Sequence, residues 1–306
     1  MDHGINTKRS ASVTAVIAAI VTHTFWGVSF LASRTALDTA HMFLLLSHRF
    51  LTSFLVLNLI LLTGLGRLRL RGKRVLLAIL LGVCEPVVYF FGEQYGILHS
   101  NTIFSGVMIA MIPIVSMAAA GPILHERSTA GQVIFSILSV GGVIGMGMMS
   151  RGSGALEWGG VAALVIAVVS AAAYTLLSRG ISGEFSPFER TYILIGLGAA
   201  VFTVLAMIQC RGSVRAYLQP LATPSYLISI LFLSVCCSVL GYFLSSYALT
   251  KLPVAQATVF SNLTTAVSVF AGAYFLHEPF NVFGLICSIV ILVGIWGVQV
   301  TAPKEN

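Results

Sequence analysis

Long apolar runs follow one another along almost the whole chain. Each run is about 20 residues long, which is the length that an α-helix needs to cross the hydrocarbon core of a bilayer. A stretch such as 75–83 shows no alternation of apolar and polar positions, so the runs are predicted to be helices rather than strands of a membrane barrel. Ten spans are predicted, with approximate limits at residues 13–33, 42–63, 75–97, 101–124, 129–149, 158–178, 188–209, 225–249, 254–276 and 281–300. We therefore expect an all-α membrane protein with ten transmembrane helices and no separate soluble domain.

The composition excludes several classes of protein. Of the 306 residues, 57% are hydrophobic and 9% are charged, whereas a soluble domain is nearer half apolar and about a quarter charged. A soluble enzyme or binding module could not bury this much apolar surface, and disordered chains are poor in apolar residues. The net charge is +7, but the basic residues lie in short gaps between apolar runs, so no nucleic acid partner is expected. The cysteines lack metal-type spacing and are expected to be small buried hydrophobes.

The distribution of Lys and Arg predicts the orientation. Most of these residues, including the cluster from Arg67 to Arg74 and the single residues Arg179 and Arg190, fall on one side if the spans alternate. Because basic loops favour the cytoplasm, we expect both termini to be cytoplasmic. The expected location is the inner or plasma membrane, with many crossings.

The two halves of the chain share a repeated pattern. A shift of 152 residues pairs Leu124-His125-Glu126 with Leu276-His277-Glu278, and Gly142 and Gly145 with Gly294 and Gly297. A shift of 145 residues pairs Ser33-Arg34 with Ser178-Arg179. Residues 1–150 and 151–306 are thus predicted to be two repeats of five spans each. Five is odd, so the second repeat enters the membrane from the opposite side, an inverted arrangement that is typical of secondary transporters.

These features together resemble the drug/metabolite transporter superfamily, in particular the EamA family. The residues that carry the resemblance are Phe25-Trp26-Gly27, His48-Arg49-Phe50, Pro113, His125-Glu126-Arg127 and His277-Glu278-Pro279. The resemblance covers essentially the whole chain and implies carriers with cytoplasmic termini, many of which export amino acids and related metabolites. These motifs are specific for the fold and weak for the substrate, so the cargo has to be argued from the site.

Glu85 is the most informative candidate for transport chemistry. It lies about ten residues into the third span, near the midplane of the membrane at 1.5 Å per residue. Pro86 follows it and permits a kink, because proline lacks the N–H of a helical hydrogen bond. The second half has Cys237 at the equivalent position, and this asymmetry favours function over scaffold. We expect Glu85 to bind a proton, an ammonium group or each in turn; the alternative is a protonated, hydrogen-bonded residue that only packs.

Three further residues are predicted to act near Glu85. His23 lies at a similar depth in the first span and is a candidate partner for Glu85, with simple hydrogen bonding as the alternative. Glu93 and Arg49 are expected to form an ion pair that is either structural or part of an outer gate. His125 and Glu126 lie at a membrane edge, where a structural role is expected.

Aromatic and polar side chains are predicted to complete the site. Rings can stack on cargo or hold a cation, and the alternative for each ring is ordinary packing. The candidates are Trp26, Phe30, Tyr89, Tyr242 and the amide of Asn262.

The sequence lacks the motifs of several catalytic classes. It contains no GxxxxGK[ST] loop, no HExxH and no GxSxG, so no enzyme activity, cofactor or metal is expected. Uphill transport would then need an ion gradient, for which a proton is the simplest choice. The expected partners are a small-molecule substrate and the lipid bilayer, with the chain a monomer or dimer. The leading prediction is a secondary transporter that exports amino acids or related metabolites. The alternative is a proton-coupled exporter of amphipathic or cationic compounds.

Overall fold

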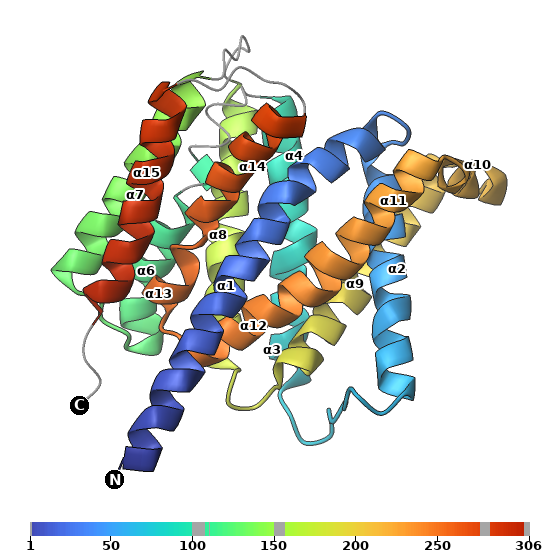
Figure 1. The fold of residues 1–306 in the computed structure, drawn as a ribbon. Helices are drawn as coiled ribbons and strands as arrows, with labels where there is room; N and C mark the ends of the chain where they lie inside the picture. Colours follow the sequence, from blue (N-terminus) through green and yellow to red (C-terminus); the bar gives the residue numbers. More distant parts are fainter. Residues whose placement is uncertain (1, 100–107, 110, 150–156, 276–281, 303–306) are drawn as a thin grey trace.

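The computed structural model describes residues 2–99, 108, 109, 111–149, 157–275 and 282–302, and the secondary-structure elements among them are helices (Figure 1). The first half contains α1 (Asp2–Leu37), α2 (Met42–Leu62), α3 (Val75–Gly82), η1 (Val83–Val88), α4 (Tyr89–Leu98), α6 (Ile112–Leu124) and α7 (Ala130–Met149). The second half contains α8 (Trp158–Gly180), α9 (Pro187–Gln209), α10 (Val214–Leu218), η2 (Gln219–Ala222), α11 (Pro224–Phe232), η3 (Leu233–Leu240), α12 (Gly241–Lys251), α13 (Val254–Thr258), α14 (Ser261–Phe275) and α15 (Val282–Val300).

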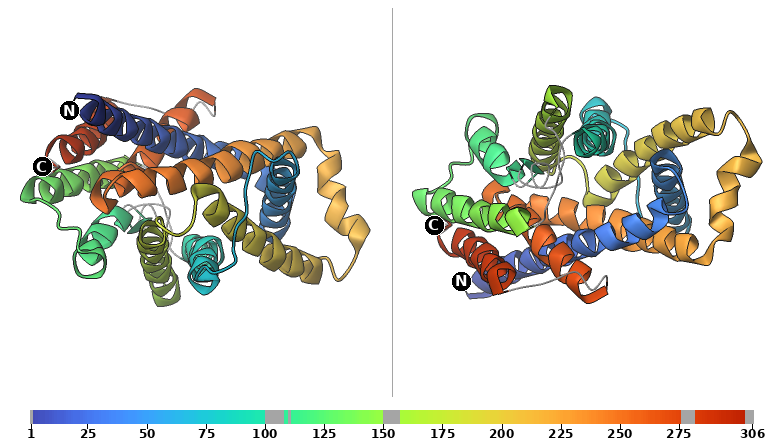
Figure 2. Two further views of the ribbon diagram at one scale, coloured as in Figure 1. Left: turned by 90° about the horizontal axis from the view of Figure 1, so that it is seen from below. Right: turned by 90° about the horizontal axis from the view of Figure 1, so that it is seen from above.

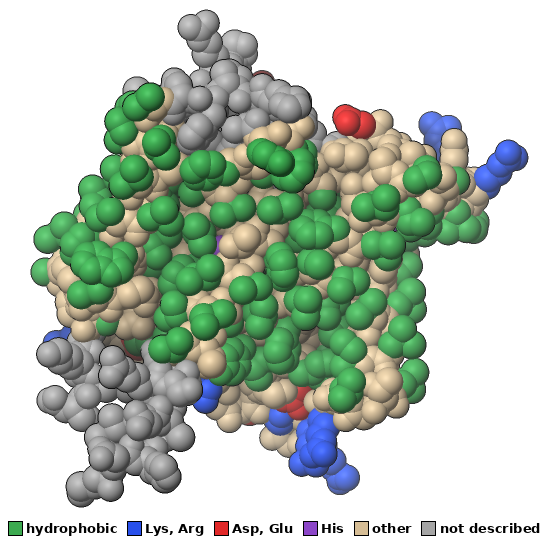
Figure 3. Space-filling model, viewed as in Figure 1, with side chains coloured by type: hydrophobic (Ala, Val, Ile, Leu, Met, Phe, Trp, Pro, Cys, Tyr) green, Lys and Arg blue, Asp and Glu red, His purple; other side chains and the backbone are tan. Residues whose placement is uncertain are grey.

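Within the described residues, seven helices are long and apolar enough to cross a membrane. They span Val13–Leu37, Met42–Leu62, Val75–Glu93, Trp158–Gly180, Pro187–Gln209, Pro224–Lys251 and Val282–Val300. Figure 3 shows apolar side chains over the middle of one face, with Lys and Arg near its two ends. The all-helical membrane fold is therefore confirmed, while the full set of ten crossings stays a prediction.

The helices of the two halves are interleaved. The opening helix of the first half, α1, packs against α11, α12 and α14 of the second half. Its counterpart α8 packs against α3, α4 and α6 of the first half. Equivalent helices also meet in the pairs α2–α9 and α7–α15, which two further views make clear (Figure 2). α1 begins and α15 ends at the same end of the molecule, called the terminal face below (Figure 1). This arrangement fits two repeats of opposite orientation.

Glycines bring α7 and α15 into close contact. A Cβ at Gly142 would lie 2.9 Å from the Cys287 carbonyl oxygen, and one at Gly294 would lie 2.6 Å from the Ser139 Cβ. Small residues that let helix backbones approach are typical of membrane interfaces. Close packing of α7 against α15 therefore accounts for these glycines.

The third helix of each half is interrupted at an equivalent place. The π-helical segments η1 and η3 separate α3 from α4 and α11 from α12. In η1, Glu85 has an extended backbone, with φ −143° and ψ 123°. The ring of a following proline disfavours the helical conformation, so Pro86 explains this break and confirms the predicted kink. No proline lies within η3, so its sequence gave no comparable signal.

Candidate functional site

Glu85 lies at the boundary between the two halves. Its side chain is placed by the break in η1, and the residue is 9% exposed. Its Oε1 accepts a hydrogen bond of 2.9 Å from the hydroxyl of Tyr242, a buried residue of α12 in the second half. Its Oε2 has no hydrogen-bond partner among the described residues. Among the described residues, a side chain of the second half thus holds one of the two carboxylate oxygens of Glu85.

Trp26 and His23 extend this contact along α1. The Trp26 indole N–H donates to the Cys237 carbonyl oxygen over 2.9 Å, and the indole meets the Tyr242 ring edge-on with centroids 5.5 Å apart. The His23 ring lies perpendicular to Trp26 at 5.0 Å, and its Nδ1 is 3.1 Å from Thr264 Oγ1 of α14. His23 is therefore connected to Glu85 through Trp26 and Tyr242 rather than by a direct hydrogen bond.

The helix interruptions leave backbone carbonyls for other helices to use. Cys84 O, in η1, accepts a 2.9 Å hydrogen bond from Ser170 Oγ of α8. Cys237 O, in η3, accepts the bond from Trp26 of α1. Each opening helix thus binds the interrupted helix of the opposite half, and π-helical bulges are frequent at functional sites. Sequence analysis missed Ser170, because a lone serine in an apolar run carries no signal of its own.

Arg49 and Glu93, the predicted ion pair, each have partners in the structure. Arg49 is 5% exposed, donates from Nε to Ser238 Oγ over 2.7 Å and lies 5.6 Å from the centre of the Phe90 ring. Glu93 Oε1 accepts a 2.8 Å hydrogen bond from the Tyr89 hydroxyl. The structure thus brings Tyr89 and Glu93 together, while an Arg49–Glu93 ion pair stays a prediction.

Two further residues were predicted to line the site. Asn262 Nδ2 donates to Ser139 Oγ of α7 over 3.0 Å, so Asn262 contacts α7 rather than Glu85. Phe30 lies in α1, and its side chain is outside the described part of the structure.

Charged residues join the two halves at the terminal face. Within the described ranges, three ion pairs cross between them: Lys73–Glu189 at 2.6 Å, Arg74–Glu184 at 2.8 Å and Arg179–Glu126 at 2.7 Å. Glu189 also completes a capping box with Ser186 at the start of α9. The backbone N–H and guanidinium of Arg74 hold the pKa of Glu184 below its usual range. These contacts close the terminal face of the protein.

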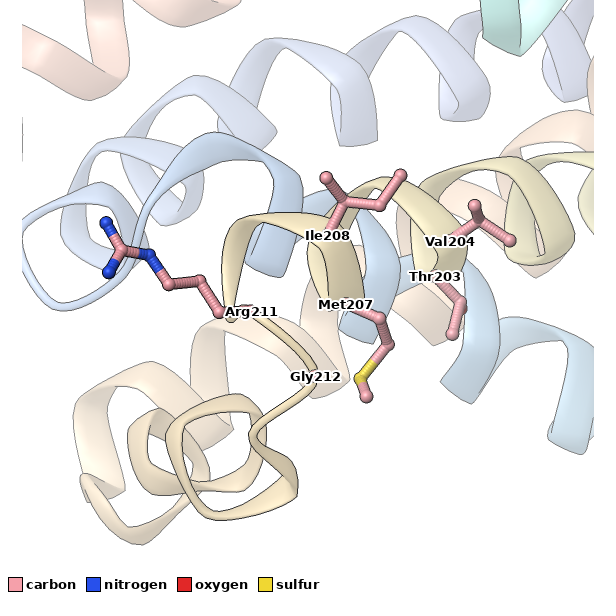
Figure 4. A pocket seen from close by; sticks show the side chains of 6 residues that line it. All are labelled: Thr203, Val204, Met207, Ile208, Arg211 and Gly212. Atoms are coloured by element: carbon pink, nitrogen blue, oxygen red, sulfur yellow. The ribbon is translucent and has the colours of Figure 1, made fainter.

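A pocket of about 460 Å³ lies at the end of α9, away from the predicted site residues. It is lined by Thr203, Val204, Met207, Ile208, Arg211 and Gly212. Figure 4 shows the Arg211 side chain extending away from Met207. Its lining is largely apolar, so it offers little polar chemistry for recognising a cargo.

The chemistry of the Glu85 cluster is that of binding. It offers an acid, a phenol, an indole and an imidazole in contact across the two halves. No group of three or more His, Cys, Asp or Glu side chains that could hold a metal occurs in the described regions. The cluster can bind a proton or a cation at Glu85 and pack an apolar group against the rings.

An apolar helical bundle of two interleaved halves around a buried acid defines a polytopic membrane protein of the two-repeat transporter class. The chain belongs to the EamA-like transporter family, whose model matches residues 13–148 and 158–300.

Relatives and a solved structure agree with this assignment. The chain is 31% identical over 297 residues to the uncharacterized transporter YcxC of Bacillus subtilis, covering 95% of each chain. It is 26% identical to an uncharacterized transporter of Archaeoglobus fulgidus, covering 92% of this chain and 96% of the relative. A crystal structure that is 14% identical has the same fold, with a TM-score of 0.79 over 94% of this chain and 97% of the other.

Proposed function

We propose that this member of the family is a secondary carrier that exports amino acids or related small metabolites by alternating access. The observation that supports this proposal best is the position of the buried Glu85 between the halves, where its Oε1 accepts a hydrogen bond from Tyr242 of the second half. Few charged residues occur inside membranes, and those that do usually serve transport or pairing. A cargo amine would bind Oε2, while the apolar part of the cargo would pack against Trp26 and Tyr242.

Inverted repeats provide a physical basis for the cycle. Each opening helix contacts the interrupted helix of the other half, through Trp26 and Cys237 O in one case and Ser170 and Cys84 O in the other. A rocking motion of one half against the other would change both contacts together. Such a motion would open the Glu85 cluster first to one side of the membrane and then to the other.

Coupling to protons is part of this proposal. A buried carboxylate can hold either a proton or a cargo amine, but not both, so protonation on one side would release the cargo there. The same arrangement supports a second candidate, a proton-coupled exporter of amphipathic or cationic compounds. The observation in its favour is the contact between the Trp26 and Tyr242 rings beside Glu85, since aromatic rings attract cations.

Counterflow in proteoliposomes tests these proposals. Vesicles loaded with a mixture of unlabelled amino acids are expected to take up a labelled amino acid from that mixture, and Glu85→Gln is expected to abolish this uptake while the protein stays folded and inserted. Glu157→Gln, at the start of α8 and away from the cluster, is the matched control and is expected to transport normally. Wild-type counterflow by Glu85→Gln would refute the role of Glu85. Counterflow of a labelled lipophilic cation such as tetraphenylphosphonium, without amino-acid counterflow, would favour the second candidate.

A further inference from the structure

Glu126 lies at a reversal of the chain directly after α6. His125 has a left-handed backbone with φ of 56°, and the Glu126 N–H donates to Ala120 O across the end of the helix over 3.3 Å. A left-handed residue at the end of a helix turns the chain away from the helix axis. The reversal brings the Glu126 carboxylate against the second half.

In the second half, the Glu126–Arg179 pair lies at the ends of three helices. Glu126 Oε1 accepts from Arg179 Nε of α8 over 2.7 Å, and Oε2 accepts from the backbone N–H of Val254, the first residue of α13, over 2.8 Å. Arg179 Nη1 also donates to Leu249 O and Thr250 O, 3.2 and 3.0 Å away, at the end of α12. Carboxylates at helix starts and guanidiniums at helix ends are both favoured electrostatically. One ion pair thus joins α6 to α8, α12 and α13.

Arg190 holds together the helix ends of the second half that lie beside the Glu126–Arg179 pair. This fully buried side chain of α9 donates to the carbonyl and hydroxyl oxygens of Ser178, to Ser246 O and to Thr250 Oγ1. All these partners belong to the second half, and Thr250 accepts from both Arg179 and Arg190. The ends of α8, α9 and α12 are therefore fixed to one another. A separation of the two halves here would break the bonds of Glu126 and leave those of Arg190 intact.

The exposure of the pair distinguishes it from a buried scaffold contact. The Arg179 and Glu126 side chains are 24% and 23% exposed, so water can replace the bonds when they break, and single ion pairs that reach water are weak. The repeat gives both residues a counterpart of the same type. Glu126 corresponds to Glu278, which lies outside the described residues, and Arg179 corresponds to Arg34. Equivalent residue types in both halves are expected where both halves perform the same task.

We propose that the Glu126–Arg179 pair is a gate, which holds the terminal face closed and separates when the carrier opens toward that face. The proposal rests on alternating access as the proposed function. In the structure described here the gate is closed, and the Lys73–Glu189 and Arg74–Glu184 pairs support the same closure beside α9. Opening would separate α6 from the joined ends of α8, α12 and α13.

A distance measurement across the terminal face tests the gate without any cargo. Spin labels are attached through an azide-bearing unnatural amino acid at Arg127 and Lys251, two exposed positions on either side of the pair, so that the native cysteines stay in place. Pulsed electron paramagnetic resonance then gives the distance distribution in lipid nanodiscs. Glu126→Gln and Arg179→Gln each break the ion pair, and Glu157→Gln is the control of the same residue type away from the gate.

The wild type and the control are expected to give mainly one short distance. Either gate variant is expected to increase the long-distance population by about threefold to tenfold, the range for the loss of a partly exposed charged hydrogen bond. Unchanged distributions in a folded gate variant would overturn the gate. If the distances shift but no counterflow of amino acids is found, the gate stands and the assignment of the cargo falls. If counterflow is normal and the distances do not shift, the gate falls and the transport function stands.

Discussion

Two adjacent glycines of α7 are expected to respond in opposite ways to the same substitution. Nothing among the described residues lies within 4 Å of the place that a Cβ would take at Gly141, whereas at Gly142 this Cβ would lie 2.8 Å from Ile291 Cγ1 and 2.9 Å from Cys287 O. Alanine in place of a helical glycine gains about 0.5–1 kcal/mol of stability through backbone entropy and propensity. Gly141→Ala should therefore be slightly stabilising.

Gly142→Ala has the same gain but also has to move α15. Carbon atoms in contact normally lie about 3.5–4.0 Å apart, so the two helices would have to separate by roughly half an ångström or more. Overpacking of this kind costs about 1–3 kcal/mol. Because the propensity gain is common to both variants, the difference between them measures the overpacking alone. We expect Gly142→Ala to be less stable than Gly141→Ala by about 1–3 kcal/mol.

Thermal unfolding of the purified variants in one detergent measures this difference. The separation would also lengthen the hydrogen bond from Ser139 Oγ to Ile291 O, which is 3.3 Å in the wild type, so no compensating contact is expected. Equal unfolding temperatures for the two variants, or a higher one for Gly142→Ala, would refute the close approach of α7 and α15. That result would also remove the packing explanation for Gly294.

Two further predictions concern the site and the terminal face. Tyr242→Phe removes the hydroxyl that donates to Glu85 Oε1. Since a hydrogen bond to a charged group contributes about 1.5–3 kcal/mol, the cargo concentration for half-maximal counterflow should rise by about tenfold or more. An unchanged concentration would contradict the role of this bond. Glu184 has a pKa below its usual range because of the N–H and guanidinium of Arg74. Its ionised form therefore stabilises the folded protein at pH values above the usual glutamate pKa. This stabilisation is lost as the pH falls through the lowered pKa. The unfolding temperature of the wild type should therefore exceed that of Glu184→Gln at pH 7, with the difference vanishing under acid conditions, and a difference that does not depend on pH would count against the ion pair.

The parts of the fold that follow from local chemistry could be predicted. The long apolar runs give the helices, and the Glu85–Pro86 pair gives the break in the third span, because the restriction that proline imposes acts within two residues. The glycines at 142 and 294 are also visible in the sequence, and close packing of helices is the role that local chemistry suggests for them. A residue without a side chain in an apolar helix has few other uses.

The parts that depend on partners far apart in the sequence could not be predicted. Arg190 was placed with the basic residues that flank the spans, but it is fully buried in α9, because four acceptors of the second half surround its guanidinium. The charge of Arg190 alone does not predict that these acceptors surround it. The bond between Tyr242 and Glu85 joins residues 157 positions apart, and η3 forms without a proline. These features arise from the way in which the halves meet.

The exchange of α1 and α8 has a consequence for the origin of such chains. A polypeptide of half this length would insert its first helix with little of its own to pack it against, since that helix finds most of its neighbours in the other half. Such a chain would need a second copy inserted in the opposite orientation. Each subunit would then pack its first helix against the other subunit, as in domain swapping. Fusion of the two genes then fixes one copy of each orientation in a single molecule and removes the need for a subunit that inserts both ways.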